Sequence, residues 1–238
     1  MGSHFKQIRN NKLNPNGLKL AFEGSHVSYD QYENMRKFFP NTSWENTSMI
    51  LENLAAVKDN YELDCIRTAV EVTDKVYEEI LPMLQPGYTE KEVANKMVSK
   101  YREYADGEAY SPIVATGPNG ALPHAIPTDR EFKEGDFIVI DAAAKYGGYH
   151  ADMTRTPVVR KSSEKHEEVY EIVKEAQKRG CDIAKSGVPC KEVDFVTRDY
   201  ISKMGYGEYY THGTGHGLGL EIHTSPRFSP QSDQILQK

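Results

Sequence analysis

The sequence has few cysteines, a single tryptophan and no long hydrophobic run. Its three cysteines show no Cys-x-x-Cys spacing, so neither a disulfide framework nor a thiolate zinc site is indicated. The longest apolar run, 137–144, contains an aspartate and is far shorter than the roughly 18 residues of a membrane-spanning helix. The first residues lack the basic-then-apolar pattern of a secretory signal. These absences favour a cytoplasmic protein with reduced thiols and no membrane partner.

An excess of basic residues is also missing. Lysine and arginine number 29 against 35 acidic residues, so the formal net charge is −6. A mildly acidic chain offers no broad positive surface to nucleic acid. At roughly 150 residues per domain, a length of 238 residues suits one large domain with a smaller fragment. The composition therefore predicts a globular protein without a nucleic-acid partner, and it leaves the chemistry open.

The N-terminal part of the chain is polar. It contains a predicted strand at 18–22 and a predicted helix at 28–39, which Pro40 ends. These elements form part of a βα unit that is too small to bury a core of its own. We therefore interpret residues 1–50 as a fragment that precedes a main domain at 51–238.

The same order of predicted elements occurs twice in the main domain. Apolar positions at helical spacing predict two helices, the second opened by a capping box of Thr89 and Glu92, and strand-like segments follow. The predicted helices are 57–81, 89–104, one through 169–176 closed near Gly187, and one through 193–200; the predicted strands are 111–115, 136–142, 149–159, 208–211 and 218–222. A first unit at 58–160 would need an equal second unit to extend beyond residue 238. The pattern predicts an α/β fold of the α+β kind, with a pseudo-two-fold ααβ repeat whose second copy is incomplete.

Two aspartates stand where a predicted β-hairpin brings them together. The apolar strand 137–140 ends in Asp141, and Asp152 follows the glycine pair 147–148. A turn at 146–147 would place the two aspartates opposite each other, with Cβ atoms about 4.5–5.5 Å apart. Carboxylates that close repel unless a proton or cation lies between them, and metal ions about 3.5–4 Å apart would suit the gap. Two surface aspartates beside a turn are the alternative, against which the apolar strand argues.

Histidines gather in two stretches rich in glycine and proline. His124 lies in the first, and the segment 212–223 holds His212, His216 and His223 among four glycines. The glycines exclude a regular helix and with it the paired histidines of a helical zinc site. Neutral imidazoles bind metals and carry protons near neutral pH, although a lone histidine is more often structural or solvated. Two aspartates and a histidine suit a divalent metal ion, but three ligands are too few for two ions.

The motifs around these residues jointly resemble one family. They are Gly117-Pro-Asn-Gly-Ala-Leu-Pro-His124-Ala-Ile-Pro-Thr-Asp-Arg130, Ile140-Asp141 with Asp152-Met-Thr-Arg-Thr156, and His212-Gly-Thr-Gly-His216-Gly-Leu-Gly-Leu-Glu-Ile-His223. They closely resemble the Xaa-Pro dipeptidases (prolidases) and Xaa-Pro aminopeptidases of the pita-bread metallopeptidase family. The resemblance covers about residues 50–238 and implies the pita-bread fold, whose pseudo-two-fold repeat agrees with the repeat above. It also makes residues 1–50 the remnant of the family's N-terminal domain.

The resemblance implies a two-metal site. Asp141 would be a ligand of the first ion, Asp152 would bridge both ions and His216 would bind the second. The ions implied are Mn²⁺ or Co²⁺, with Zn²⁺ as the alternative. The family continues to a Glu-Pro-Gly segment and a later Glu that complete the metal pair and supply the general base, and this sequence ends before both. We therefore expect the 238-residue chain to bind metal weakly and to hydrolyse Xaa-Pro substrates poorly.

The resemblance also implies catalytic histidines on the substrate side. His124 and His223 would hydrogen-bond the scissile carbonyl or the tetrahedral intermediate, and His212 would lie beside the substrate. The substrate implied is a peptide with proline in the second position. A homodimer is implied for the full-length protein.

Three functions remain open at this point. The first is a metallopeptidase, either a dipeptidase or an aminopeptidase, that cleaves the bond between an N-terminal residue and a following proline. The second is a non-catalytic binding protein with the same fold, against which the intact set of Asp141, Asp152 and His216 argues. The third is a methionine aminopeptidase, which shares the Asp–Asp–His pattern. The segment 117–125 favours proline specificity over this third function.

Overall fold

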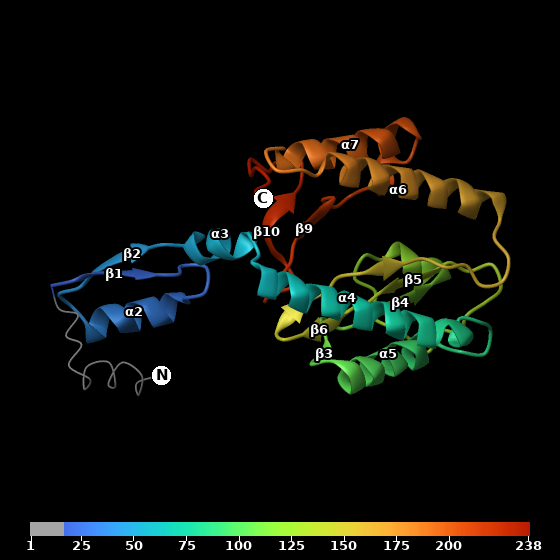
Figure 1. The fold of residues 1–238 in the computed structure, drawn as a ribbon, viewed down its shortest axis with the longest axis horizontal. Coiled ribbons are helices and arrows are strands. Elements are labelled where there is room, and N and C mark those ends of the chain that lie inside the picture. Colours follow the sequence, from blue (N-terminus) through green and yellow to red (C-terminus); the bar gives the residue numbers. More distant parts are fainter. Residues whose placement is uncertain (1–16) are drawn as a thin grey trace. The chain divides into compact units, whose positions relative to one another are not determined.

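The chain forms two units, Met1–Ala55 and Ala56–Lys238, and the computed structural model describes residues 17–238 (Figure 1). The missing secretory signal concerns the first residues, which lie outside this described range. No helix between residues 17 and 238 combines the length and the apolar character needed to cross a membrane. All the candidate site residues belong to the second unit.

The first unit is a βαβ arrangement that continues into a short helix. Its elements are β1 (Lys19–Phe22), α2 (Tyr29–Phe38), β2 (Ser43–Asn46) and α3 (Ile50–Ala56). The two strands pair in parallel, and a capping box between Ser28 and Gln31 opens α2. Phe39 is the one buried hydrophobic residue between residues 17 and 55. The predicted strand and helix are confirmed, and the unit buries as little as expected.

The second unit combines two helix pairs with three small sheets. Its helices are α4 (Asn60–Ile80), α5 (Glu90–Tyr104), α6 (Glu164–Ile183) and α7 (Cys190–Lys203), with 3-10 turns η1 (Leu81–Met83), η2 (Gly117–Ala121) and η3 (Gly207–Tyr209). Its strands are β3 (Gly107–Glu108), β4 (Ile113–Thr116), β5 (Ile138–Asp141), β6 (Ala144–Tyr146), β7 (Tyr149–His150), β8 (Thr154–Arg155), β9 (Gly215–Gly217) and β10 (Thr224–Phe228). The sheets have the orders β3-β6-β7, β4-β5-β8 and β9-β10. The four predicted helices are confirmed, as is the capping box of Thr89 and Glu92.

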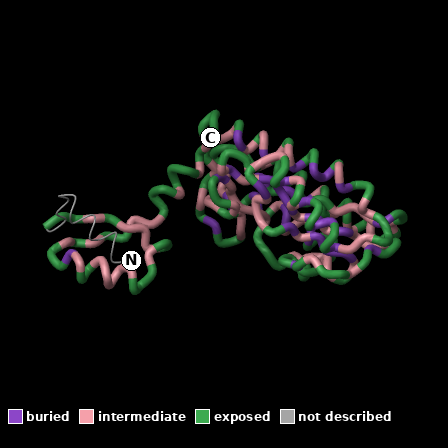
Figure 2. Tube along the Cα trace, turned by 90° about the horizontal axis from the view of Figure 1, so that it is seen from below, coloured by how far each residue is buried: buried purple, intermediate pink, exposed green. Residues whose placement is uncertain are grey.

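The core of the second unit lies between α4, α5 and the strands β4 and β5. Val76, Val93, Tyr101, Ile138 and Ile140 are fully buried there, and Figure 2 shows the buried positions gathered inside this part of the chain. Each such side chain contributes about 1.5–3 kcal/mol on burial. The strand that ends in Asp141 is therefore anchored by the main core, as its apolar sequence predicts.

The second helix pair is held together by a close approach of backbones. A Cβ atom at Gly180 of α6 would lie 2.9 Å from Thr197 Cγ2 of α7, closer than two carbon atoms can pack. Only a residue without a side chain allows this approach. In contrast, the predicted apolar face of α6 is only partly covered, because Val173 is 54% exposed in the described structure.

The hairpin that carries the two aspartates has a different register from the predicted one. Tyr146 pairs with Tyr149, so the turn consists of Gly147 and Gly148 rather than residues 146–147. Both glycines have positive φ, at 57° and 83°, which a two-residue type I′ turn requires. Asp141 consequently faces Thr154, and Asp152 becomes its diagonal neighbour on the same face of the hairpin. The prediction that the two aspartates pair directly was therefore wrong.

Three predicted strands also differ from the structure. The strand expected at 149–159 is divided into β7 and β8, which belong to different sheets, with Asp152 between them. The segment expected as a strand at 208–211 begins with a 3-10 turn. The strand expected at 218–222 is a series of bends, and β9 and β10 lie on either side of it. Strand bounds depend on pairing partners that alternation in one segment does not reveal.

Candidate active site

A single tyrosine hydroxyl joins the two aspartates of the hairpin. Tyr110 Oη lies 2.5 Å from Asp141 Oδ1 and 3.0 Å from Asp152 Oδ1. Burial raises the pKa of Asp141, and the nearby charge of Asp152 adds to this, so the pKa stays above its usual value despite the hydrogen bond from Tyr110. Burial and both carboxylates likewise raise the pKa of Tyr110. One hydroxyl proton serves two carboxylates, so the pair keeps negative charge that a cation would neutralise.

His216 faces Asp152 with its Nε2 nitrogen. It stands at the centre of β9, and its Nδ1 donates to the Gly217 carbonyl at 2.9 Å. In a neutral imidazole the other nitrogen, Nε2, is then an acceptor. Nε2 lies 3.4 Å from Asp152 Oδ2. Two acceptors that face each other fit a shared metal ion, and the carbonyl on Nδ1 is a usual outer partner of a metal-bound histidine.

Two further histidines lie in the same neighbourhood. The ring of His223 packs against His216 with centroids 4.3 Å apart. Partial burial, followed by the neighbouring His216 and Arg227, lowers the pKa of His223 below its usual value. His124 is exposed and within electrostatic range of Asp141 and of His223. His223 thus lies against a candidate ligand and His124 lies within electrostatic range of Asp141, and their catalytic roles stay a prediction.

His212 has a different environment. Its Nδ1 donates to the Gly213 carbonyl at 2.8 Å, and its ring meets that of Tyr210 edge-on, with centroids 4.9 Å apart. Between residues 17 and 238, no hydrogen bond, ion pair or ring contact joins His212 to the aspartates or to the other site histidines. A role for His212 beside the substrate stays a prediction.

The three candidate metal ligands meet in pairs rather than as a compact triad. Within residues 17–238, the one set of potential ligands whose atoms all lie within 4.8 Å of one another is Glu23, His26 and Glu52, in the first unit. Asp141, Asp152 and His216 do not meet that condition together. The donor chemistry therefore fits a divalent ion at Asp152, which links the other two ligands. We assign no role to the first-unit set, whose His26 is exposed.

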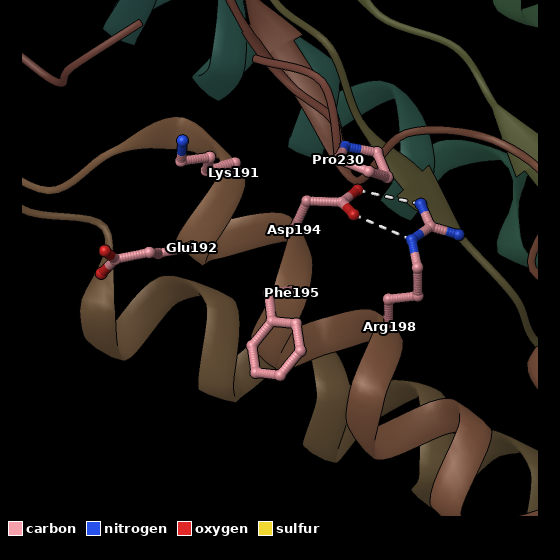
Figure 3. A pocket seen from close by; sticks show the side chains of 6 residues that line it. All are labelled: Lys191, Glu192, Asp194, Phe195, Arg198 and Pro230. Atoms are coloured by element: carbon pink, nitrogen blue, oxygen red, sulfur yellow. Dashed lines mark hydrogen bonds and ion pairs between the residues drawn. The ribbon is translucent and has the colours of Figure 1, made fainter. Parts of the chain in front are cut away.

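A separate hollow of about 310 Å³ lies beside α7 (Figure 3). Its lining consists of Lys191, Glu192, Asp194, Phe195, Arg198 and Pro230. Figure 3 shows Asp194 and Arg198 pointing toward each other, and two hydrogen bonds of 2.8 and 2.9 Å join them. Oδ1 of Asp194 also accepts from the Thr214 amide at 3.0 Å. The acidic group of the hollow is thus already engaged in holding the segment between His212 and His216.

Two tyrosines that hold the site together, Tyr110 and Tyr77, were not predicted from the sequence. Tyr110 precedes Asp141 by 31 residues, and no local pattern links them. Tyr77 of α4 donates from its buried hydroxyl to the carbonyls of Ile140 and Met153, each at 2.9 Å. These carbonyls belong to the neighbours of Asp141 and Asp152 in the chain. Only the apolar period around Tyr77 was visible in the sequence, and it indicated burial without a polar contact.

The site is one of acidic and histidine ligands suited to divalent metal, set on a hairpin and a glycine-rich strand. The sequence profile described as metallopeptidase family M24 matches residues 64–238. The chain belongs to this family of divalent-metal-dependent peptidases.

Relatives and solved structures agree with this assignment. A Xaa-Pro dipeptidase of Pyrococcus furiosus is 37% identical over 220 residues, which are 92% of this chain and 63% of that protein. A solved Xaa-Pro dipeptidase from Bacillus anthracis has a TM-score of 0.91 at 37% identity, covering 98% of this chain and 65% of that one. A solved X-Pro aminopeptidase from Thermotoga maritima has a TM-score of 0.87 at 35% identity, covering 99% and 66%. The chain therefore has the pita-bread fold, as predicted, and spans 63% of the length of that curated relative.

Proposed function

We propose that the protein is a metallopeptidase that hydrolyses the bond between an N-terminal residue and a following proline. The observation that carries this proposal is the placement of Asp152. Its Oδ1 shares the hydroxyl of Tyr110 with Asp141, and its Oδ2 faces Nε2 of His216. The names of the relatives support proline in the second position of the substrate, and the segment 117–125 supports it over methionine aminopeptidase activity.

We propose that Asp141, Asp152 and His216 take part in holding two divalent ions, Mn²⁺ or Co²⁺ with Zn²⁺ as the alternative. We propose Asp152 as the shared ligand, and the different partners of its two oxygens, Tyr110 and His216, support this. Bound ions of this kind lower the pKa of water toward neutrality and so supply a nucleophile. Tyr110 orients the two carboxylates, and the Gly217 carbonyl orients the ring of His216.

The histidines would act on the substrate. His223, whose pKa is lowered by burial and by its neighbours, presents a ring next to His216. His124 approaches from the exposed segment after η2. Donors at these two positions would hydrogen-bond the carbonyl before proline as negative charge develops on its oxygen. His212 is proposed as a contact of the substrate farther from the acidic pair.

The proposal extends to the domains, the assembly and the location of the protein. Residues 51–238 would be the metallopeptidase domain and residues 1–50 part of an N-terminal domain. The full-length protein would be a homodimer in the cytoplasm, where its cysteines, free in the structure, would stay reduced.

Measurement of Mn²⁺ binding and of proline release from Met-Pro tests this function. We expect weak but measurable calorimetric Mn²⁺ binding and slow Mn²⁺-dependent proline release in the unmodified chain, with still slower release from Met-Ala. Asp152→Asn should weaken Mn²⁺ binding by about 100-fold or more, because loss of an outer partner alone costs 10–100-fold. Asp182→Asn makes the same chemical change at an exposed position paired with Lys178 and should leave both measurements unchanged. Proline release that survives chelation, or Mn²⁺ binding that survives Asp152→Asn, would contradict the proposal.

A further inference from the structure

Glu90 is a fully buried carboxylate that the proposed reaction does not use. It is the first residue of α5 and has no exposed surface. A buried charge is costly unless hydrogen bonds replace its lost water. Oε1 accepts from the amide and hydroxyl of Thr116, at 2.7 and 3.1 Å. Oε2 accepts from the amide and hydroxyl of Thr128, at 2.9 and 2.6 Å, and Asn119 Nδ2 approaches both oxygens, at 3.0 and 3.1 Å.

The donors to Glu90 come from the two ends of the segment that carries His124. Thr116 is the last residue of β4, directly before this segment, and Thr128 lies directly after it. The carboxylate therefore joins the start of the loop to its end across its base. Arg130, whose Nε donates to the Thr116 carbonyl at 3.2 Å, adds a second link between the same ends.

Between these ends the loop has little apolar anchoring, although backbone bonds from Gly117 to Phe137 and from Lys91 to Thr128 also hold its ends. Leu122 and Ile126 are 58% and 82% exposed, and Ala125 is the one buried residue between residues 117 and 127. Apolar burial therefore contributes little to its position. Burial alone would raise the pKa of Glu90, but the hydrogen bonds from Thr128, Thr116 and Asn119 outweigh it and hold the pKa below its usual value. The loop and the ionised carboxylate thus stabilise each other.

The second helix pair contains a comparable arrangement. Asp194 of α7, with a side chain only 1% exposed, accepts from the amide and hydroxyl of Thr214, at 3.0 and 2.9 Å. Thr214 lies between His212 and His216. Asp194 is neutralised by Arg198, whereas the hydrogen bonds to Glu90 within residues 17–238 come from uncharged groups. The buried charge of Glu90 is therefore compensated by the loop and its two ends, whereas that of Asp194 is also compensated by an arginine.

We propose that Glu90 is a positioning residue that sets the place of the loop that carries His124, and with it the place of that histidine. This inference rests on the proposed function for its consequence in catalysis, and on the hydrogen bonds at the base of the loop for its structural basis. A carboxylate is required because each of its oxygens accepts a backbone amide, from Thr116 on one side and Thr128 on the other. The amide of a glutamine has one oxygen, so it would turn its NH₂ group toward one of these donors and release one end of the loop.

The first test follows the loop without any activity assay. In protein labelled with ¹⁵N-threonine and ¹⁵N-histidine, Glu90→Gln should raise amide exchange at Thr116 or Thr128 by about 10-fold or more, since a factor of ten corresponds to a modest local loss of stability. The imidazole signals of His124 should shift, while the exchange of Thr214 stays unchanged. Asp129→Asn makes the same chemical change at an exposed residue of the same region and should alter none of these signals.

Two results of this exchange measurement would contradict a positioning role for Glu90. Unchanged His124 signals, or an equal rise in exchange at Thr214, would overturn the proposal, because the role of Glu90 would then be absent or merely global. If Glu90→Gln fails to fold, Thr128→Val removes the 2.6 Å hydroxyl bond from the side of the loop and should produce the same His124 shift.

The second test uses hydrolysis of Met-Pro in the presence of Mn²⁺. Glu90→Gln should lower kcat with little change in KM and no change in Mn²⁺ affinity. In combination with His124→Ala it should cost no more than His124→Ala alone, because Glu90 acts through that histidine. Additive losses would overturn the proposal. An unmodified chain that releases no proline would refute the proposed function, and the exchange and histidine measurements would still decide the role of Glu90.

Discussion

Removal of one buried hydroxyl should loosen the hairpin that carries both aspartates. Tyr77 is 9% exposed, and its hydroxyl contacts the carbonyls of Ile140 and Met153, each at 2.9 Å. Tyr77→Phe keeps the ring, so no large cavity forms and the loss is confined to these contacts. The two buried carbonyls share one hydroxyl proton, and leaving buried acceptors without that donor costs about 1–3 kcal/mol, so we expect the free energy of unfolding to fall by about this amount.

Urea unfolding followed by circular dichroism measures this loss. Tyr170→Phe is the control, because Tyr170 is 47% exposed on α6 and should lose less than about 0.5 kcal/mol. Tyr77→Phe should also weaken Mn²⁺ binding, since the carbonyls it releases adjoin Asp141 and Asp152 in the chain. A loss in Tyr77→Phe no larger than in the control would refute the reasoning.

The pH dependence of the same variant gives an independent check. Burial and the charge of Asp141 raise the pKa of Tyr77 above its usual value. A group with a raised folded-state pKa stabilises the fold fully below its unfolded pKa, about 10 for tyrosine. The difference between Tyr77→Phe and the unmodified chain should therefore be constant from neutral pH to about pH 10 and shrink only above it. A difference that declines between pH 7 and 9 would contradict the burial of this hydroxyl.

Three further perturbations test other parts of the structure. Although burial opposes it, hydrogen bonding from Arg198 holds the pKa of Asp194 below its usual value. The ionised Asp194 therefore stabilises the fold fully above its unfolded pKa, about pH 4, and this contribution is lost as the pH falls further. Asp194→Asn should remove this part of the acid sensitivity in urea unfolding at pH 3–5. Gly180→Ala brings a Cβ within 2.9 Å of Thr197 Cγ2 and should cost about 1–3 kcal/mol, recovered in part by Thr197→Ser in thermal unfolding. Gly147→Ala forces alanine to a φ of 57° and brings its Cβ to 3.0 Å from Cys65 Sγ, so in the same assay it should cost at least about 1–2 kcal/mol.

Local signals in the sequence were enough to predict the helices. Each signal acts within a single helix: the capping box of Thr89 and Glu92 opens α5, and the apolar period through Tyr77 follows α4. Both are present in the structure. Strands were less predictable, because their bounds depend on a partner elsewhere in the chain. The segment 218–222 alternates like a strand, yet its neighbours β9 and β10 make the pairing.

The hairpin shows how a small local choice changes a site. Its sequence allows a turn at 146–147 or at 147–148. The structure has the second turn, in which both central residues are glycines with positive φ. This choice moves the partner of Asp141 from Asp152 to Thr154. Both aspartates stay on one face because the shift is two residues, and side chains alternate with a period of two. The predicted pairing was therefore wrong while the predicted proximity held.

The sequence by itself determined the kinds of ligand, the family motifs and the helices, because these depend on residue type and on contacts a few positions apart. The tertiary structure alone decided how the candidate residues are oriented. Tyr110 reaches Asp141 across 31 positions of the chain, Tyr77 reaches Ile140 across 63, and Glu90 reaches Thr128 across 38. Hydrogen bonds between such distant residues form only once the apolar core has packed α4 and α5 against the strands, and no local pattern in the sequence records them.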